Sequence, residues 1–105
     1  MEYLTTGEQK AVRKIVKTAR ASGFLISIWE GEDWAIRRSD NEAEILKALG
    51  STGQDRIDFV RPPADQSEKP TRAGWVLLVY GNNPDGSEVV ADARDNEVTN
   101  LILSQ

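Results

Sequence analysis

The sequence has 105 residues, of which 29% are charged and 39% are hydrophobic, and its formal net charge at pH 7 is −4. This length and composition predict one soluble domain, residues 1–105, and argue against a disordered chain. Cysteine and histidine are both absent, which excludes disulfides, thiolate nucleophiles and catalysis by a serine–histidine or cysteine–histidine pair within one chain.

The charged residues are unevenly distributed along the chain. Residues 1–22 carry five basic and two acidic side chains, whereas residues 23–105 carry eight basic and fifteen acidic ones. An acidic body repels phosphates, so we do not expect free nucleic acid as a partner and favour a basic protein surface. No apolar run reaches the ~20 residues of a membrane span, and the N-terminus lacks the pattern of a secretory signal. We therefore expect a cytoplasmic protein with no membrane partner.

The first predicted element is an amphipathic helix that ends before Gly23. Thr5 lies three residues before Glu8, which is the spacing of a capping box. Thr6 and Gln9 offer the same spacing one residue later. One side of the helix is apolar and the opposite side is basic. The apolar residues are Val12, Ile15, Val16 and Ala19, and the basic residues are Lys10, Arg13, Lys14 and Lys17.

A hairpin of two strands is predicted next, over residues 24–29 and 34–38. The β-branched and aromatic residues of both segments favour strands. A two-residue Gly31–Glu32 turn and a four-residue loop give the same register. In either case Trp29 faces Trp34 across the two strands, and such an aromatic pair stabilises a hairpin.

A short second helix is predicted to follow and to end at Gly50. Ser39 and Glu42 have the spacing of a capping box. Asp40 and Asn41 are alternative N-caps for the same helix.

Three further strands are predicted, over residues 57–61, 75–80 and 87–93. The segment between the first two, residues 62–74, holds three prolines and no large apolar residue, which predicts an exposed, mobile loop. The strand WVLLVY at 75–80 is apolar on both faces, as is typical of a central strand. Its second face requires a cover, which is either this loop or another chain.

A short C-terminal helix is predicted, with Asp95 or Asn96 as its N-cap, although the β-branched content also allows a terminal strand. The predicted order is α-β-β-α-β-β-β-α. It favours an α+β fold with a mainly antiparallel five-stranded sheet and helices packed on one face.

The acidic segment near the last hairpin raises the question of a metal site. The residues Asn83-Pro84-Asp85-Gly86 each occupy a favoured position of a type I turn. In a calcium-loop template the first ligand position would fall on Gly81, which has no side-chain oxygen. We therefore predict a turn, with no metal and no cofactor.

Asp92 and Asp95 are the candidates for a catalytic carboxylate pair. We expect Asp92 to share an exposed strand face with Glu88 and Val90, and Asp95 to serve as a helix cap. The sequence therefore predicts no enzymatic activity. A metal-dependent enzyme that uses the carboxylates of residues 85–95 is an alternative.

The segment WVLLVYGN at residues 75–82, followed by EVVADARDN at residues 88–96, carries a resemblance. It is similar to the C-terminal half of small acidic proteins of unknown function encoded by bacteriophages and prophages. In those proteins a tryptophan-containing apolar strand is followed by a strand that closes in an aspartate-rich run, here Asp92, Asp95 and Asn96. Ala93 and Arg94 stand where an aromatic is often found. The resemblance implies a phage-encoded protein in the host cytoplasm and transfers no functional residue.

We predict a non-catalytic interaction protein, a phage accessory factor that binds or inhibits a host protein through an acidic surface. The host protein would be one that handles nucleic acid. The candidate acidic patch consists of Glu30, Glu32, Asp33, Asp85, Glu88 and Asp92. The alternative is a nucleic-acid-binding protein that uses the basic helix face of Lys10, Arg13, Lys14 and Lys17. A homodimer through the sheet is a further alternative. Trp29, Trp34 and Trp75 are interpreted as sheet packing, with a binding hot spot as the other interpretation.

Overall fold

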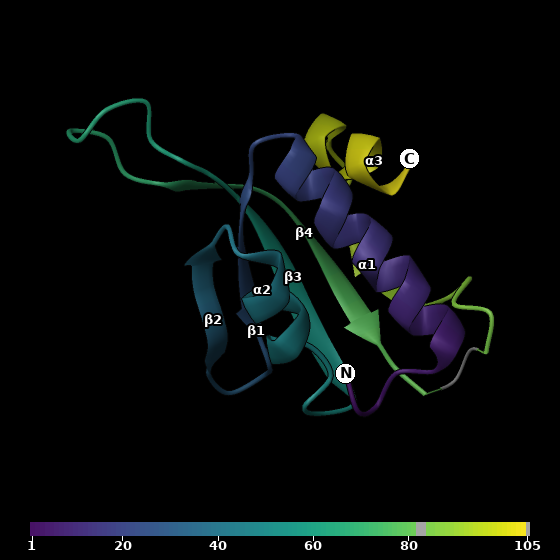
Figure 1. The fold of residues 1–105 in the computed structure, drawn as a ribbon. Coiled ribbons are helices and arrows are strands. Elements are labelled where there is room, and N and C mark those ends of the chain that lie inside the picture. Colours follow the sequence, from purple (N-terminus) through teal and green to yellow (C-terminus); the bar gives the residue numbers. More distant parts are fainter. Residues whose placement is uncertain (82–83, 105) are drawn as a thin grey trace.

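The computed structural model describes residues 1–81 and 84–104, in which five antiparallel strands form one sheet. The strands lie in the order β2-β1-β3-β4-β5, and the helices pack on one face of the sheet (Figure 1). The elements are α1 (Thr6–Ala21), β1 (Leu25–Trp29), β2 (Trp34–Ser39), α2 (Glu42–Ala48), β3 (Gln54–Arg61), β4 (Thr71–Val79), β5 (Val90–Ala93) and α3 (Glu97–Leu103). The predicted α+β class and order of elements are confirmed. None of the described helices has the length and apolarity needed to cross a membrane.

Helix α1 begins with one of the two predicted capping boxes. The Thr5 hydroxyl accepts a hydrogen bond from the Glu8 N–H at 3.1 Å, and the Glu8 carboxylate accepts one from the Thr5 N–H at 2.9 Å. Thr5, and not Thr6, is therefore the N-cap. The apolar stripe of the helix is buried against the sheet, with Val12 and Val16 fully inaccessible.

Glu8 also connects the start of α1 to the end of β4. Its two carboxylate oxygens accept hydrogen bonds from the Gly81 N–H at 2.8 and 3.1 Å, and the residue is fully buried. A buried carboxylate is costly unless it is hydrogen-bonded, and the N–H groups of Thr5 and Gly81 supply those bonds. One side chain thus fixes both the helix cap and the path of the chain after β4.

Two glycines bring the β4–β5 connection into contact with the first turn of α1. A Cβ on Gly7 would meet backbone atoms of Pro84 and Asp85, and a Cβ on Gly86 would meet the Gly7 carbonyl. Gly86 also has a φ of 77°, in the left-handed region that favours glycine. The predicted turn around Gly86 begins at Asn83, which lies outside the described residues.

The helix-facing side of the sheet holds the hydrophobic core. Ile28, Ile57 and Val76 form one row across β1, β3 and β4, and Ile26 pairs with Phe59 in the next row. All five residues are fully buried. Because side chains alternate along a strand, the residues between them point to the face that carries no helix.

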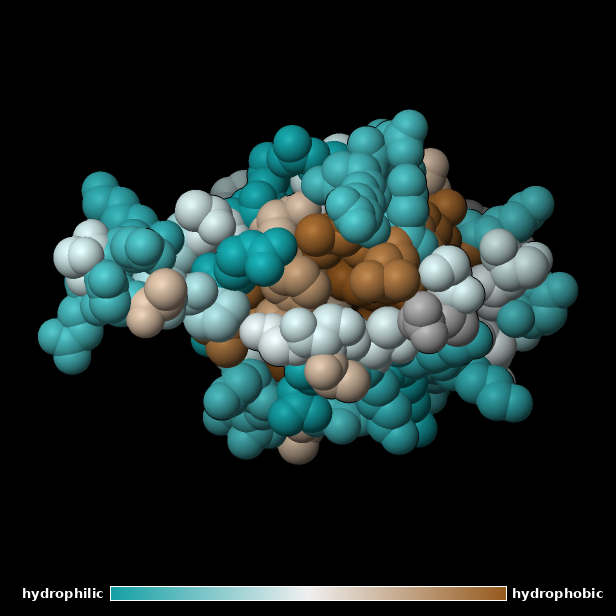
Figure 2. All heavy atoms as spheres, turned by 90° about the horizontal axis from the view of Figure 1, so that it is seen from above, coloured by the Kyte–Doolittle hydropathy of each residue, from teal (hydrophilic) through white to brown (hydrophobic). Residues whose placement is uncertain are grey.

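The surface seen from above the view of Figure 1 is partly hydrophobic. Hydrophobic side chains reach the surface in the middle of the molecule and are framed by hydrophilic ones (Figure 2).

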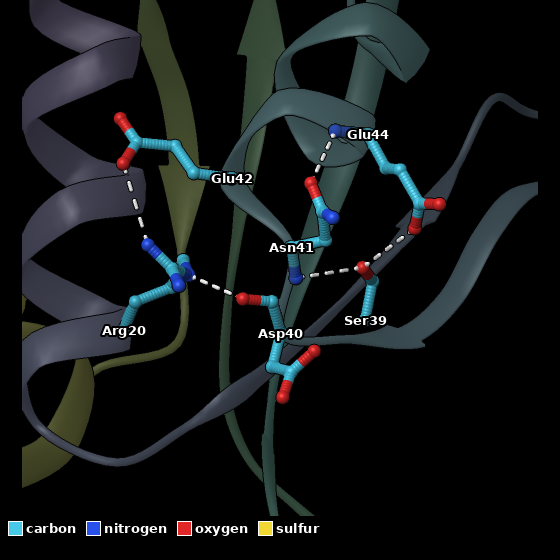
Figure 3. Close-up of polar contacts among 6 residues, drawn as sticks. All are labelled: Arg20, Ser39, Asp40, Asn41, Glu42 and Glu44. Carbon is cyan, nitrogen blue, oxygen red and sulfur yellow. Dashed lines mark hydrogen bonds and ion pairs between the residues drawn. The ribbon is translucent and has the colours of Figure 1, made fainter.

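Arg20 in the last turn of α1 binds residues at the start of α2 (Figure 3). Its guanidinium donates a hydrogen bond to the Asp40 carbonyl at 2.7 Å and forms an ion pair with Glu42 at 3.3 Å. The two helices are therefore connected through the end of one and the beginning of the other.

The N-cap of α2 is Asn41, whose side chain accepts a hydrogen bond from the Glu44 N–H at 3.1 Å. The predicted capping box of Ser39 and Glu42 is wrong, because Arg20 holds Glu42 and the Ser39 hydroxyl accepts a bond from the Asn41 N–H (Figure 3). The predicted end of the helix is confirmed, since Gly50 follows the C-cap with a φ of 73°.

The connection between β3 and β4 is shorter than predicted. Thr71 pairs with Arg61, so β4 begins at Thr71 and the connection covers residues 62–70 rather than 62–74. Antiparallel pairing gives these polar residues backbone partners that their sequence does not reveal. The connection projects beyond the end of the sheet (Figure 1).

Two other strands also begin at residues that differ from the prediction. Gln54 pairs with Val79, and this pairing extends β3 before the predicted start at Ile57. β5 begins at Val90 and not at Ser87.

The C-terminal segment is a helix rather than a strand. Asn96 is its N-cap, since its side chain accepts a hydrogen bond from the Thr99 N–H at 2.9 Å and donates one to the Ala73 carbonyl at 2.8 Å. Of the two predicted caps, Asn96 is therefore confirmed and Asp95 is wrong. Asp95 accepts a hydrogen bond from the Asn100 side chain at 2.9 Å instead.

The contact between α1 and the β4–β5 connection predicts an unusual effect of Gly7→Ala. In an exposed helix this change would stabilise the fold by up to about 1 kcal/mol. Here we expect it to lower the free energy of unfolding by about 1–3 kcal/mol, because the new Cβ overlaps the backbone of Pro84 and Asp85. Urea unfolding followed by circular dichroism measures the change.

Gly53→Ala is the matched control for that experiment. A Cβ at Gly53 would meet no atom within 4 Å, and Gly53 has no positive φ. We expect this variant to be as stable as the wild type or to gain up to about 1 kcal/mol. Equal stabilisation by both substitutions would contradict the close approach.

Candidate functional site

No helix of the described residues covers the second face of the sheet, which we call the uncovered face. Two rows of paired residues cross it: Trp29, Arg56, Leu77 and Asp92 in the first, and Ser27, Asp58 and Trp75 in the second. β4 lies between β3 and β5, as predicted for a strand that is apolar on both sides. Its side chains Trp75, Leu77 and Val79 are half-buried on this face. The 62–70 connection does not extend over them (Figure 1).

All three tryptophans of the chain lie on the uncovered face. Trp29 and Trp34 pair across the β1–β2 hairpin, and their rings meet edge to face with centroids 5.1 Å apart and planes at 73°. The predicted cross-strand pair is therefore confirmed. Trp75 lies on β4, two strands away from β1, and pairs with Asp58 of β3. The three rings are half-buried, so part of each remains accessible to a ligand.

Arginine side chains accompany these rings. The Arg37 guanidinium lies 5.3 Å from the centroid of the Trp34 ring, and that of Arg56 lies 5.9 Å from it. Cations at such distances are attracted to the face of an indole. Arg37 comes from β2 and Arg56 from β3, so the sheet brings two distant segments to one ring.

Asp58 lies among these arginines and is buried. Its two carboxylate oxygens accept hydrogen bonds from the Arg56 guanidinium at 2.8 and 3.1 Å, and Arg72 approaches one of them at 3.8 Å. The bidentate pair neutralises a carboxylate whose side chain is only 4% exposed. Arg72 is 45% exposed, and its 3.8 Å separation from Asp58 is too long for a hydrogen bond.

A pocket of about 170 Å³ opens beside Asp58, and we call it the arginine pocket. It is lined by Ser27, Trp34, Arg37, Arg38, Asp58, Val60, Pro70 and Arg72. A second pocket, of about 270 Å³, lies nearer the β1–β2 connection and includes Trp29, Arg56 and Leu77 in its lining. Both pockets are hollows of the uncovered face.

A β-bulge shapes the arginine pocket. The β1–β2 register shifts between the pairs Ile26–Ser39 and Ile28–Ile36, so that Arg37 and Arg38 together oppose Ser27. The Arg38 N–H donates a hydrogen bond to the Ser27 hydroxyl at 2.9 Å. Arg38 has a φ of 51° and is the one non-glycine residue with positive φ in the described part of the chain.

The predicted acidic patch is divided between two connections and a strand. Glu30, Glu32 and Asp33 lie in the β1–β2 connection, and Asp85 and Glu88 lie in the β4–β5 connection. Both connections are at the same end of the sheet, but strand β3 lies between the two pairs of strands that they join. Asp92 lies on β5 opposite Leu77. The sheet therefore does not bring the six carboxylates into one cluster.

Asp92 does not share a face with Val90, contrary to the prediction. The β4–β5 register shifts between Leu77 and Leu78, so Asp92 pairs with Leu77 on the uncovered face and Val90 pairs with Leu78 on the core side. Among the described residues, no three carboxylates are arranged to hold a metal ion.

The predicted basic face of α1 forms a second exposed surface. Lys10, Arg13, Lys14 and Lys17 are exposed and line a groove of about 560 Å³ together with Thr6, Gln9 and Thr18. All these residues belong to one helix, and no tryptophan lies among them. This surface is on the helical side of the molecule, whereas the tryptophans are on the uncovered face.

Sequence reasoning missed Arg37, Arg38, Arg56 and Arg72 as site residues. The segment RIDF, residues 56–59, alternates polar and apolar residues, and this pattern places Arg56 and Asp58 on one face. That signal was available in the sequence. The convergence of β2, β3 and β4 residues was not, because it requires the order of the strands and the bulge at Arg37 and Arg38.

Asp55, a buried carboxyl group, belongs to the core side. It accepts hydrogen bonds from the Gly50 N–H and the Tyr80 hydroxyl, each at 2.8 Å. Burial raises the pKa of Asp55 above its ordinary value, and these two hydrogen bonds oppose that rise. Burial and then the charge of Asp55 raise the pKa of Tyr80 well above its usual range. The cluster joins the start of β3 to the end of β4 and is structural.

No family model, no curated protein and no solved structure matches this chain.

The raised pKa of Asp55 predicts a pH-dependent contribution to stability. The folded protein binds the Asp55 proton more tightly than an unfolded chain, whose carboxyl has a pKa of 3.8. The contribution is therefore complete below that pH and is lost as the pH rises through the folded-state value. Asp55→Asn removes the titration and keeps an oxygen that accepts from Gly50 and Tyr80. We expect the stability of the wild type relative to Asp55→Asn to decrease as the pH rises above about 4.

Urea unfolding of both proteins at several pH values measures this difference. A difference that stays constant, or that grows with pH, would mean that Asp55 is not protonated more readily in the folded state.

Proposed function

We propose that the protein is a non-catalytic binding protein whose working surface is the uncovered face of the sheet. The observation that carries the proposal is the gathering of all three tryptophans with Arg37, Arg56 and Arg72 on that face. Tryptophan and arginine are the residue types most enriched at binding hot spots. Catalysis would need a different set of residues, because the sequence has no histidine or cysteine to act as base or nucleophile.

The charge of the uncovered face supports an anionic partner. β2, β3 and β4 contribute four arginines and one aspartate to it, and β5 adds Asp92, so arginines outnumber carboxylates there although the whole chain carries a net charge of −4. Arg37 and Arg38 form no ion pair with any carboxylate of the described residues. Their charges are available to a partner with complementary negative groups.

A second candidate is a phage accessory factor that binds a basic, nucleic-acid-handling host protein through acidic residues. Two acidic connections at the same end of the sheet favour it, since Glu32, Asp33 and Asp85 are exposed there. A basic partner that spans that end would contact both connections.

A pull-down from bacterial lysate with the immobilised protein tests the first proposal. We expect the double variant Arg37→Glu, Arg38→Glu to lose the partner that the wild type retains at low salt, because its charge is reversed on the uncovered face. Binding by the wild type should weaken at about 0.5 M salt, where the Debye length falls to a few ångströms. The matched control, Arg13→Glu with Lys17→Glu, makes the same change of charge on α1 and should retain the partner.

The same experiment distinguishes the second candidate. Glu30→Gln with Glu32→Gln should lose the partner only if the acidic connections bind it. Equal retention by the wild type and the Arg37, Arg38 variant would make the first proposal wrong. Light scattering identifies the case in which the uncovered face binds a second copy of this chain, since the wild type would then be a dimer.

A further inference from the structure

Three arginines line the arginine pocket. Arg37 and Arg38 reach it from the β-bulge, and Arg72 reaches it from the first residues of β4. None of the three has a carboxylate within hydrogen-bonding distance in the described part of the structure. Guanidinium groups with unused donors bind phosphate oxygens with good geometry and strength. The pocket therefore has the composition of an anion site.

The size of the pocket indicates which part of a ligand it holds. Its volume of about 170 Å³ is smaller than the roughly 300–1,000 Å³ of pockets that enclose a whole small molecule. One phosphate-sized group fits, while the rest of the ligand lies on the open surface. Asp58 in the lining disfavours a free anion, although its pairing with Arg56 neutralises most of this charge.

The surroundings of the pocket are aromatic. Trp34 lines the pocket, Trp29 contacts Trp34 edge to face, and Trp75 is paired with Asp58. Indole rings and guanidinium planes are the surfaces on which unpaired bases stack in proteins that bind single strands. A duplex keeps its base faces stacked inside, so it cannot use these rings.

We propose that the arginine pocket binds a backbone phosphate of a single-stranded nucleic acid, and that neighbouring bases stack on the tryptophans of the uncovered face. The proposal rests on the proposed function, in which this face is the binding surface. The acidic β1–β2 connection, with Glu30, Glu32 and Asp33, repels phosphates at one end of the face. The phosphates would therefore lie on the pocket side of that connection, and the uncharged bases would reach the rings of Trp29 and Trp34, which flank it.

Intrinsic fluorescence provides a direct test, because every tryptophan of the chain is on the proposed binding face. Titration with an oligothymidylate of about 16 nucleotides at low salt should quench the emission as bases stack on the rings. An oligouridylate of the same length reports on RNA. A duplex of equal length should bind more weakly and quench less.

The variant Arg37→Gln with Arg72→Gln tests the pocket itself. We expect binding of the oligothymidylate to weaken by about five- to fifty-fold. The slope of log K against log salt should fall by about 0.7 for each phosphate contact that is lost. The control Arg13→Gln with Lys17→Gln removes the same charge from α1 and should change neither quantity. Thermal unfolding by circular dichroism shows whether each variant is folded. The variant Trp75→Phe tests stacking separately, because it retains a ring with a smaller stacking surface.

Three results would overturn the proposal: no quenching by any single strand at low salt, equal binding of duplex and single strand, or a wild-type affinity in the Arg37, Arg72 variant. If oligonucleotides fail while the Arg37→Glu, Arg38→Glu variant still loses its lysate partner, this inference is wrong and the proposed function stands. If oligonucleotides fail and that variant also retains its lysate partner, both the inference and the proposed function are wrong.

Discussion

The structure depends on the fact that its helices cover only one face of a five-stranded sheet. The helix-facing side chains of β1, β3 and β4 form a conventional apolar core, in which Ile28, Ile57 and Val76 are fully buried. The side chains between them cannot be buried in the same way, since strand residues alternate between faces. They must stabilise one another at the surface or be covered by a partner.

The uncovered face meets this constraint with large amphipathic side chains. Trp29 and Trp34 pack edge to face, and arginine stems and guanidinium groups lie over Trp34. The ion pair of Arg56 with Asp58 satisfies a buried carboxylate without a helix above it. Such a surface is stable in water and still presents rings and charges, which is why packing and binding are compatible interpretations of the same tryptophans.

Local features of this fold were predictable from the sequence. The Thr5–Glu8 capping box and the Trp29–Trp34 pair depend on residues at most five positions apart, and both are confirmed. Where several caps competed, as at the start of α2, the outcome depended on Arg20 from another helix. Propensity alone cannot reveal such a contact.

Features that depend on distant residues were not predictable. Glu8 was expected only as part of a cap, yet its carboxylate also accepts bonds from Gly81, 73 positions away. The candidate site on the uncovered face also depends on contacts between distant residues. Arg56 and Trp34 meet only because β3 pairs with β1 and β1 pairs with β2, and no local pattern encodes that order.

Net charge does not reveal where the charges lie on the surface, for the same reason. The expectation that nucleic acid is repelled used the charge of residues 23–105, which carry eight basic and fifteen acidic side chains. In the fold, five acidic residues of the candidate patch occupy connections at one end of the sheet, while Arg37, Arg38 and Arg72 line one pocket. At physiological salt the Debye length is about 8 Å, so a ligand in that pocket responds chiefly to the nearest charges. Positive φ at Arg38 has a conformational cost of about 1–3 kcal/mol. The bulge that imposes it turns two consecutive arginines toward the pocket, and this is the local reason to regard the pocket as a site rather than a gap between side chains.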